Sequence, residues 1–434
     1  MFYQRLVLCF SLLLLISCGG QGSYSGPASG TFVVNVTVSG LPSNGSRVDV
    51  QNNGASTLSF VSNGTQTFPS QAMGSAYSVS ISTQPSPLYC SVSSTTGSNP
   101  VNVSVTCSDQ YVYITNYATS KLSRLSVGAG GLMTQVELVS TGQNPTSVVI
   151  HPNGKYVFVA NYTSSTISVY SLLSGSLSAV YAPSAGSGPY NLTITPNGSY
   201  LYCVNILDGT ISEYQISSSG VLTSIGSTSV SAGINSMAID PSGSYVYVSG
   251  GTSSSTLYEY QIQSNGTLLL RASTNDHISG PTAVHVSPGG KFAYVVNSTS
   301  NSVAVYSIGA GGTLAYSTNI STGSVPHDIA FSPSGAYAYV SNYGGSGSPL
   351  GTTLTQYTVN PSSGALTPMT SPSVTAGSGP YSVVVDPSGY GVFSSNYNDN
   401  SISQFIISGT GSLPGVASHT FNTNIGGPTS IAIH

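Results

Sequence analysis

Short runs of alternating apolar and polar residues, separated by turns, fill most of the chain. From Tyr111 onward, one kind of run ends in Asn in most of its copies, as in Tyr156–Asn161 and Phe292–Asn297, and it recurs about every 45 residues. A second kind of run precedes a Pro-x-Gly corner, as at residues 146–151. Alternation with a period of two predicts β-strands, and the Pro and Gly of the corners predict tight turns.

The repeat predicts a seven-bladed β-propeller over residues 111–434. Each unit holds four runs: one before the Pro-x-Gly corner, one ending in Asn, a third such as Ile167–Tyr170, and a weaker fourth. Four short strands in a unit of about 45 residues is the pattern of a propeller blade. The first unit begins at its second strand, and Pro428–His434 matches a first strand. We therefore expect the last strand to complete the first blade and close the ring.

Two local features of the repeat also carry expectations. The recurrent Asn is expected to hydrogen-bond the backbone of the turn that follows its strand. One unit is longer than the others because it contains the Gly/Ser-rich insertion Gly344–Gly351. Such a loop could contact a partner, or it could be slack that the fold tolerates.

The segments before the repeat predict export and a second domain. Residues 31–108 contain alternating runs between turns, which favours a small β-sandwich-like domain and makes the whole fold all-β. Residues 1–17 combine one positive charge, a short apolar run and small residues, the pattern of a secretory signal. Leu15-Ile16-Ser17-Cys18 resembles the bacterial lipobox, which implies that Cys18 is lipidated and that residues 18–30 form a flexible tether.

This resemblance has consequences for location and for the cysteines. A lipid on Cys18, followed by Gly19 rather than Asp, implies a protein anchored in the bacterial cell envelope at the outer membrane, with the membrane as its partner. An exported chain permits disulfides, and Cys90 and Cys107 are the expected pair. Cys203 lies in an alternating run, so we expect a buried apolar residue there.

The charge content excludes one large class of partners. Only 4% of the 434 residues are charged, with 7 Lys and Arg against 11 Asp and Glu. So few basic residues cannot neutralise a phosphate backbone, so nucleic-acid binding is excluded. The chain has 29 Tyr and no Trp. Its aromatic and β-branched content favours a folded, strand-rich protein despite the low charge.

Runs such as Tyr339-Val-Ser-Asn342 resemble the YVTN family of bacterial surface propellers. The stretch 111–434 also resembles the seven-bladed lactonase-like superfamily, which includes 6-phosphogluconolactonase. That resemblance implies Pro-Arg-His at the start of one innermost strand and Asn-Glu at the end of the next. Here the Arg, His and Glu positions hold His327, Asp328 and Tyr343. A second alignment places Thr282, Ala283 and Ser298 there, so neither retains the enzymatic set.

The residue just after the start of each innermost strand is expected to face one mouth of the central channel. The resulting ring is neutral and polar, with aromatic members, and suits a carbohydrate, a peptide strand or ordered water. Its members are Thr146, Tyr190, Asn235, Thr282, His327, Tyr381 and Thr429.

Few other side chains suggest chemistry. His327 and Asp328 are candidate catalytic residues, but neighbours in a strand point to opposite faces, so they are not expected to pair. His285 lies between two valines and is expected to pack between blades. The residues Asn396–Asn400 include one carboxylate, which favours a polar turn over a calcium site. No motif for a metal or cofactor is present, so none is expected.

Two functions follow from these observations. The first is an envelope-anchored, non-catalytic propeller that binds a protein or a glycan, or serves as a surface scaffold. The alternative is a lactonase-like hydrolase that acts on an uncharged lactone through His327 or Asp328. Hydrolysis of a lactone needs a general base and a group that stabilises the oxyanion.

Overall fold

The computed structural model describes residues 30–41, 47–83, 85, 88–92, 96–98, 101–128, 132–172, 175–250, 255–344, 351–422 and 426–434. The predicted signal, Cys18 and almost all of the tether lie outside these residues, so the lipid anchor and the envelope location stay predictions. Most of the Gly344–Gly351 insertion lies outside them as well. Within the described ranges, the one helix is the short 3-10 turn Ala310–Gly312, and no helix is long and apolar enough to cross a membrane.

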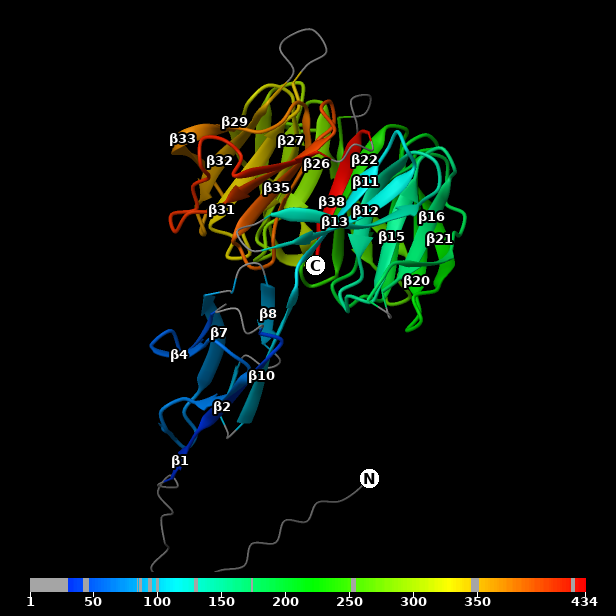
Figure 1. The fold of residues 1–434 in the computed structure, drawn as a ribbon. Coiled ribbons are helices and arrows are strands. Elements are labelled where there is room, and N and C mark those ends of the chain that lie inside the picture. Colours follow the sequence, from blue (N-terminus) through cyan, green and yellow to red (C-terminus); the bar gives the residue numbers. More distant parts are fainter. Residues whose placement is uncertain are drawn as a thin grey trace, which may run out of the picture.

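Residues 111–434 form seven four-stranded antiparallel sheets (Figure 1). Each innermost strand contacts the next and the last contacts the first, so the sheets form a ring around a central channel. The innermost strands are β14 (Pro145–Ile150), β18 (Pro189–Ile194), β22 (Ile234–Ile239), β26 (Pro281–Val286), β30 (Pro326–Phe331), β34 (Pro380–Val385) and β38 (Pro428–Ile433). The second strands are β11 (Tyr111–Asn116), β15 (Tyr156–Asn161), β19 (Tyr200–Asn205), β23 (Tyr245–Gly250), β27 (Phe292–Asn297), β31 (Tyr337–Asn342) and β35 (Gly391–Asn396).

The two outer rows complete each blade. The third strands are β12 (Lys121–Val127), β16 (Thr166–Ser171), β20 (Thr210–Ile216), β24 (Leu257–Ile262), β28 (Ser302–Ile308), β32 (Thr353–Val359) and β36 (Ser401–Ile406). The outermost are β13 (Met133–Ser140), β17 (Ser178–Tyr181), β21 (Leu222–Ser229), β25 (Leu268–Thr274), β29 (Leu314–Ser321), β33 (Leu366–Thr375) and β37 (His419–Asn422). Second strands are buried over nearly their whole length, because neighbouring blades cover both of their faces.

The ring closes as the repeat predicts. Strand β38 pairs antiparallel with β11, from Val112 opposite Ile433 to Asn116 opposite Pro428, and so supplies the innermost strand of the first blade (Figure 1, red beside cyan). The blade order is therefore β13-β12-β11-β38. This pairing satisfies the inner edge of β11, which would otherwise be an open sheet edge.

The small domain is a β-sandwich, as the sequence indicates. The strand order of one sheet is β5 (Gly64–Thr67), β2 (Val34–Ser39), β10 (Val101–Asp109) and β8 (Leu88–Val92). The order of the other is β4 (Ser56–Phe60), β3 (Val48–Asn52), β7 (Tyr77–Thr83) and β9 (Thr96–Gly97). Two short strands, β1 (Thr31–Phe32) and β6 (Gln71–Ala72), pair with each other. One apolar core lies between the two sheets. Cys90 and Cys107 lie opposite each other on β8 and β10 and form the expected disulfide.

The small domain lies at the end of the propeller where the C-terminus of the chain is (Figure 1). Strand β10 leads through Gln110 directly into β11. Ile81 and Ser82 of β7 line a shared cavity with Pro333 and Pro387, which belong to the turns of two blades. The mouth where the innermost strands begin is thus at the opposite end of the propeller.

Tyrosine hydroxyls join neighbouring blades. In four blades, a fully buried tyrosine of the second strand donates to a glycine carbonyl of the next blade, at 2.6–2.9 Å: Tyr202 to Gly266, Tyr247 to Gly312, Tyr294 to Gly364 and Tyr339 to Gly411. Third-strand tyrosines, such as Tyr214 with the Ser184 carbonyl (2.6 Å), connect to the preceding blade. These contacts explain why the core is rich in Tyr, since a phenol fills volume and also satisfies a buried carbonyl.

In five blades the recurrent Asn bonds side chains rather than the turn backbone that we predicted: its amide donates to hydroxyls on the third strand, as Asn161 does to Ser168 (2.9 Å) and Asn396 to Ser403 (2.9 Å). Asn116 also contacts the Lys121 carbonyl just after its turn (3.5 Å). In the blade of Asn297, the amide donates to the His277 carbonyl and Oδ1 accepts the N–H of Ser279, both at 3.0 Å. In the third strand, the register opposite Asn brings a Ser or Thr within reach. The Asn therefore links two strands of one blade. Cys203 is a buried free thiol, as expected.

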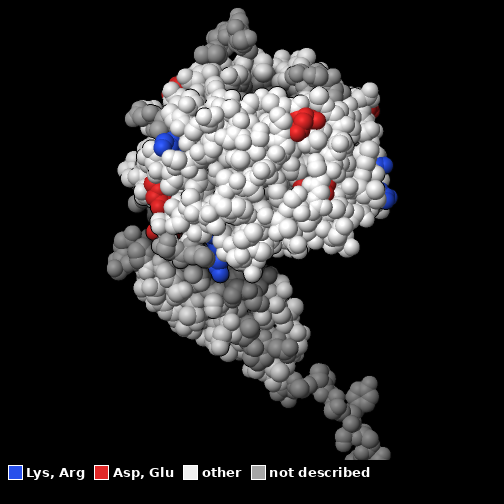
Figure 2. All heavy atoms as spheres, turned by 90° about the vertical axis from the view of Figure 1, so that its right-hand side faces the viewer, with Lys and Arg blue, Asp and Glu red and all other residues white. Residues whose placement is uncertain are grey.

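The scarce charges stand at structural positions or are scattered over the surface. Figure 2 shows one face on which almost all atoms belong to uncharged residues. Arg124 is buried, donates to Glu137 at 2.9 Å and lies 3.6 Å over the Tyr111 ring. Glu213 and Glu259 are buried on third strands, where each accepts a backbone N–H from the next blade, Glu213 from Leu268 and Glu259 from Leu314.

Replacing Glu213 and Glu259 by Gln is expected to stabilise the fold near neutral pH. Burial raises the pKa of both carboxyls. The folded state then holds their protons more tightly than the unfolded state, so stability is present in acid and is lost as the pH rises above the unfolded value. Two other blades carry Gln356 and Gln404 at the equivalent buried position.

Thermal melts across pH 4–8 check this. The double variant E213Q/E259Q should melt a few degrees higher at pH 7 and show a flatter dependence on pH. The matched control is Gln356→Glu, which should move stability in the opposite direction. A double variant that melts lower at pH 7 would contradict the assignment.

Candidate functional site

A bulge near the start of the innermost strands turns two consecutive residues towards the channel. In all seven of these strands the pairing register shifts directly after the first residue, as between Pro326 and Asp328. One extra residue in one strand breaks the strict alternation of faces. His327 and Asp328 therefore both line the channel, which corrects the prediction that they point to opposite faces.

The first of these two positions is the ring predicted from the sequence. Four of its members donate to the carbonyl of the proline that opens the next blade: Thr146 to Pro189 (3.0 Å), Asn235 to Pro281 (2.8 Å), Thr282 to Pro326 (3.1 Å) and Thr429 to Pro145 (3.0 Å). His327 contacts the Tyr381 carbonyl through Nδ1 at 2.9 Å. These side chains satisfy backbone acceptors and join consecutive blades.

The second position forms another ring, which the sequence did not reveal. Five of its side chains accept a backbone N–H from the next blade, at 3.1–3.2 Å. The donor is the residue that directly follows the second position of that blade: Ser147 accepts from Leu192, Asn191 from Met237, Ser236 from Val284, Asp328 from Val383 and Ser430 from Val148. A hydroxyl, an amide and a carboxylate fulfil this role equally, because only one acceptor oxygen is needed.

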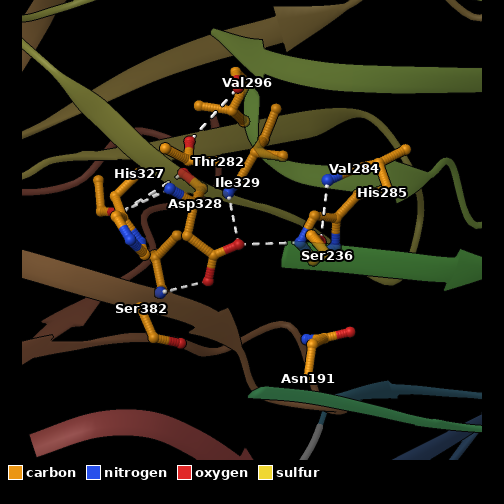
Figure 3. A network of polar contacts seen from close by, with 12 residues as sticks. Asn191, Ser236, Thr282, Val284, His285, Val296, His327, Asp328, Ile329 and Ser382 are labelled. Carbon is orange, nitrogen blue, oxygen red and sulfur yellow. Dashed lines mark hydrogen bonds and ion pairs between the residues drawn. The ribbon is translucent and has the colours of Figure 1, made fainter. Parts of the chain in front are cut away.

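Asp328 differs from the other members because its second oxygen is engaged as well. Oδ1 lies 2.8 Å from Nε2 of His285, on the preceding blade (Figure 3). The same oxygen accepts the N–H of Ile329 at 2.9 Å. In the preceding blade the second position is Ala283, whose side chain has no oxygen that could accept the N–H of Ile329. Asp328 accepts this N–H instead. The carboxylate therefore completes the ring and orients an imidazole.

This geometry fixes the charge state of Asp328. Burial alone would raise its pKa, but the hydrogen bond and charge of His285 and the amide of Val383 outweigh burial and hold the pKa below its ordinary value. Asp328 is therefore a carboxylate at neutral pH. Nε2 of His285 donates to it, which leaves Nδ1 of the imidazole as the free basic nitrogen. The side chain of His285 is 39% exposed in the channel, so this nitrogen can meet solvent.

His327 has a different environment. Its ring lies on Tyr381, with centroids 3.7 Å apart and planes tilted by 32°. Burial lowers the pKa of His327. Since Nδ1 donates to a carbonyl, the neutral ring presents Nε2 as an acceptor. The two candidates from the sequence thus share the channel, but Asp328 pairs with His285 and not with His327.

Two tyrosines form a bridge across the mouth. The hydroxyls of Tyr190 and Tyr381, from nonadjacent blades, hydrogen-bond to each other. Below them lies a channel cavity of about 190 Å³, which includes His285, Asp328 and Asn191 in its wall. Above them is a second hollow of about 370 Å³ lined mostly by tyrosines. Tyr190, Tyr381, Thr146 and Thr429 line both spaces.

No Lys or Arg lines either space among the described residues. In the same part of the chain, no group of three or more His, Cys, Asp or Glu could hold a metal ion. The turn containing Asn396–Asn400 uses its carboxylate locally: Asp399 accepts the N–H of Ser378 and the hydroxyl of Ser401, both at 2.6 Å. The channel wall therefore offers neutral donors, two imidazoles and one carboxylate.

His285 and Asn191 are the site residues that sequence reasoning missed. His285 does not pack between blades; it projects into the channel, as Figure 3 shows. The repeat could have indicated this, because aligning the blades places His285 at the same position as Val149 and Val384, and both of these valines line the channel. Asn191 uses Oδ1 as an acceptor for Met237, so its amide N–H groups stay available in the channel.

Comparison with known proteins supports a lactonase relationship. The family model described as "Lactonase, 7-bladed beta-propeller" matches residues 49–277, 270–374 and 343–430. Among curated proteins, no sequence matches the chain.

Solved structures agree in fold at low sequence identity. A candidate 6-phosphogluconolactonase from Bacteroides uniformis is 20% identical, with a TM-score of 0.67 over 75% of this chain and 99% of that one. One from Bacteroides fragilis is 19% identical, with a TM-score of 0.66 over 75% and 98%. A periplasmic gluconolactonase from Pseudomonas aeruginosa is 18% identical, with a TM-score of 0.65 over 75% and 99%. The chain thus belongs to the family of seven-bladed β-propeller lactonases.

Proposed function

We propose that the protein hydrolyses an uncharged lactone in its central channel. The observation that carries the proposal is the His285–Asp328 pair, an imidazole that is 39% exposed and is held by a carboxylate that is 17% exposed. A base oriented in this way can take a proton from the water that attacks a carbonyl carbon. The family relationship supports the same reaction class, although the Arg, His and Glu positions implied by the resemblance hold other residues.

The reaction can be assigned to residues of the channel wall. Nδ1 of His285 accepts a proton from water as the water oxygen bonds to the lactone carbonyl carbon. Asp328 stabilises the imidazolium that forms, and the amide N–H groups of Asn191 are donors for the oxyanion. When the ring C–O bond breaks, the proton passes from imidazolium to the departing alkoxide. The product is a hydroxy acid.

Among the described residues, the channel lining contains no Lys or Arg, which favours an uncharged substrate. A phosphate or a carboxylate held there would lack a counter-charge and would lose its hydration without compensation. Uncharged lactones meet no such penalty. This sets the proposal apart from an activity on phosphorylated sugars. An envelope-anchored binding scaffold remains the second candidate function, because most ring side chains are engaged in joining blades.

The test is a screen of the purified full chain with uncharged five- and six-membered lactones. His285→Ala should lower kcat/KM by about 100-fold or more, the contribution of a general base. Asp328→Asn keeps an acceptor for the N–H of Val383, as Asn191 does for Met237, but loses the carboxylate that orients His285, and it should lower kcat more than it changes KM. His277→Ala, at an exposed histidine outside the channel, is the matched control. Hydrolysis that is unchanged in His285→Ala, or absent throughout the screen, overturns the proposal.

A further inference from the structure

The hollow above the Tyr190–Tyr381 bridge is built from residues that the channel chemistry does not use. Its wall is formed by the residue directly after the last residue of five second strands: Tyr117, Tyr162, Ile206, Tyr343 and Tyr397. The floor consists of Tyr190, Tyr381, Thr146 and Thr429. We call these nine residues the tyrosine bowl. All six of its tyrosines are half-buried, so their rings are held by the fold while one side faces the hollow.

The rings of the bowl support one another. Tyr381 lies 5.8 Å from Tyr343 in an edge-to-face arrangement of 82°, and 5.8 Å from Tyr397 with the planes tilted by 35°. The ring of Tyr381 also lies on the His327 ring. Aromatic surfaces that are ordered before a ligand arrives lose little side-chain entropy on binding. The bowl is therefore a preorganised binding surface.

Its chemistry selects the class of ligand. No charged side chain lines the bowl among the described residues, so an anion or a cation would meet no opposite charge. Burial raises the pKa of Tyr117, Tyr190 and Tyr381, so these phenols are neutral donors and acceptors. A wholly apolar ligand would leave the hydroxyls without partners. A ligand with hydroxyls at its edge and C–H groups on its face satisfies both features.

We propose that the tyrosine bowl binds a neutral saccharide. The volume of about 370 Å³ falls within the range of small-ligand pockets, ~300–1,000 Å³. The bowl lies at the mouth opposite the small domain, so the chain's own N-terminal domain does not cover it. This inference does not depend on hydrolysis in the channel: a saccharide can bind in the bowl whether or not His285 is catalytic.

The experiment is calorimetric titration of the full chain with neutral disaccharides (cellobiose, maltose and diacetylchitobiose). Choline and glucose 6-phosphate are the charged probes. At least one disaccharide should bind, and Tyr117→Ala combined with Tyr162→Ala should weaken its affinity about tenfold or more, as expected from lost ring contacts. Tyr390→Ala, at an exposed tyrosine outside the bowl, is the control and should bind like the parent chain.

Several outcomes would overturn the proposal. Binding of choline or glucose 6-phosphate in place of the disaccharides would assign the bowl to a charged ligand. Binding of none of the probes, or disaccharide binding that survives the double Ala variant, would also reject it. Thermal melts of each variant separate loss of binding from loss of fold. His285→Ala should leave saccharide binding unchanged, so this result is independent of the lactone screen.

Discussion

Removal of residues 428–434 is expected to abolish cooperative folding of the propeller. These residues are β38, which pairs with β11 along five positions. Without them the first blade loses its innermost strand and the buried Ile431, and the inner edge of β11 is open. The ring hydrogen bond from Val148 to Ser430 is lost as well. The summed loss is comparable with the whole stability of a folded domain, about 5–15 kcal/mol.

Circular dichroism melts and size-exclusion chromatography measure the effect: the shortened chain should show no sharp transition and should aggregate through its open edge. Thr429→Ala is the matched control in the same strand. It removes one hydroxyl that contacts Thr115 and Pro145, and it should cost only about 1 kcal/mol. A shortened chain that melts as sharply and as high as the parent would show that ring closure contributes little.

Truncation of a single tyrosine that joins two blades has the next largest expected effect. Tyr294 is fully buried and donates to the Gly364 carbonyl at 2.8 Å. Tyr294→Ala leaves a cavity at the interface of two blades and should destabilise the fold by about 3–5 kcal/mol. Tyr294→Phe keeps the ring but leaves the carbonyl without its donor, and should cost about 1 kcal/mol.

Denaturant unfolding of both variants separates packing from hydrogen bonding. Phe158 and Phe393 are fully buried at the equivalent position in two other blades, so Phe is compatible with this interface. Phe158→Tyr is the complementary control, because it adds the hydroxyl that its blade lacks at this position. If Tyr294→Phe were as damaging as Tyr294→Ala, the hydroxyl and not the ring would be the main contribution.

The architecture was predictable because its signals are local and repeated. Alternation marks each strand, Pro-x-Gly marks each corner, and the partial unit at Pro428–Ile433 reveals the closing strand. The disulfide followed from the small number of cysteines expected in the exported chain. The contacts between blades were not predictable in this way. Tyr202 and Gly266, for example, lie 64 residues apart, and nothing in either segment specifies the partner.

The site was harder to predict for a specific physical reason. Alternating residue types in the sequence predict that successive side chains point to opposite faces of a strand. A bulge of one residue places two consecutive side chains on the same face and leaves no mark in the sequence pattern. The prediction therefore separated His327 from Asp328 and placed His285 between blades. Asp328 and His285 lie on different blades, and only the ring geometry shows that they meet. The first ring of channel residues was predicted by position, and its use in joining blades became clear from the hydrogen bonds.

The second channel ring also has a consequence for how such a fold could gain new chemistry. The fold requires only one acceptor oxygen at this position, and it accepts Ser, Asn and Asp there. A change from Ser to Asp at Ser147 or Ser236 would keep that acceptor and add a second oxygen facing the channel. Natural variation or protein engineering could thus introduce an aligned carboxylate at this position, together with a partner that compensates its charge as His285 does for Asp328.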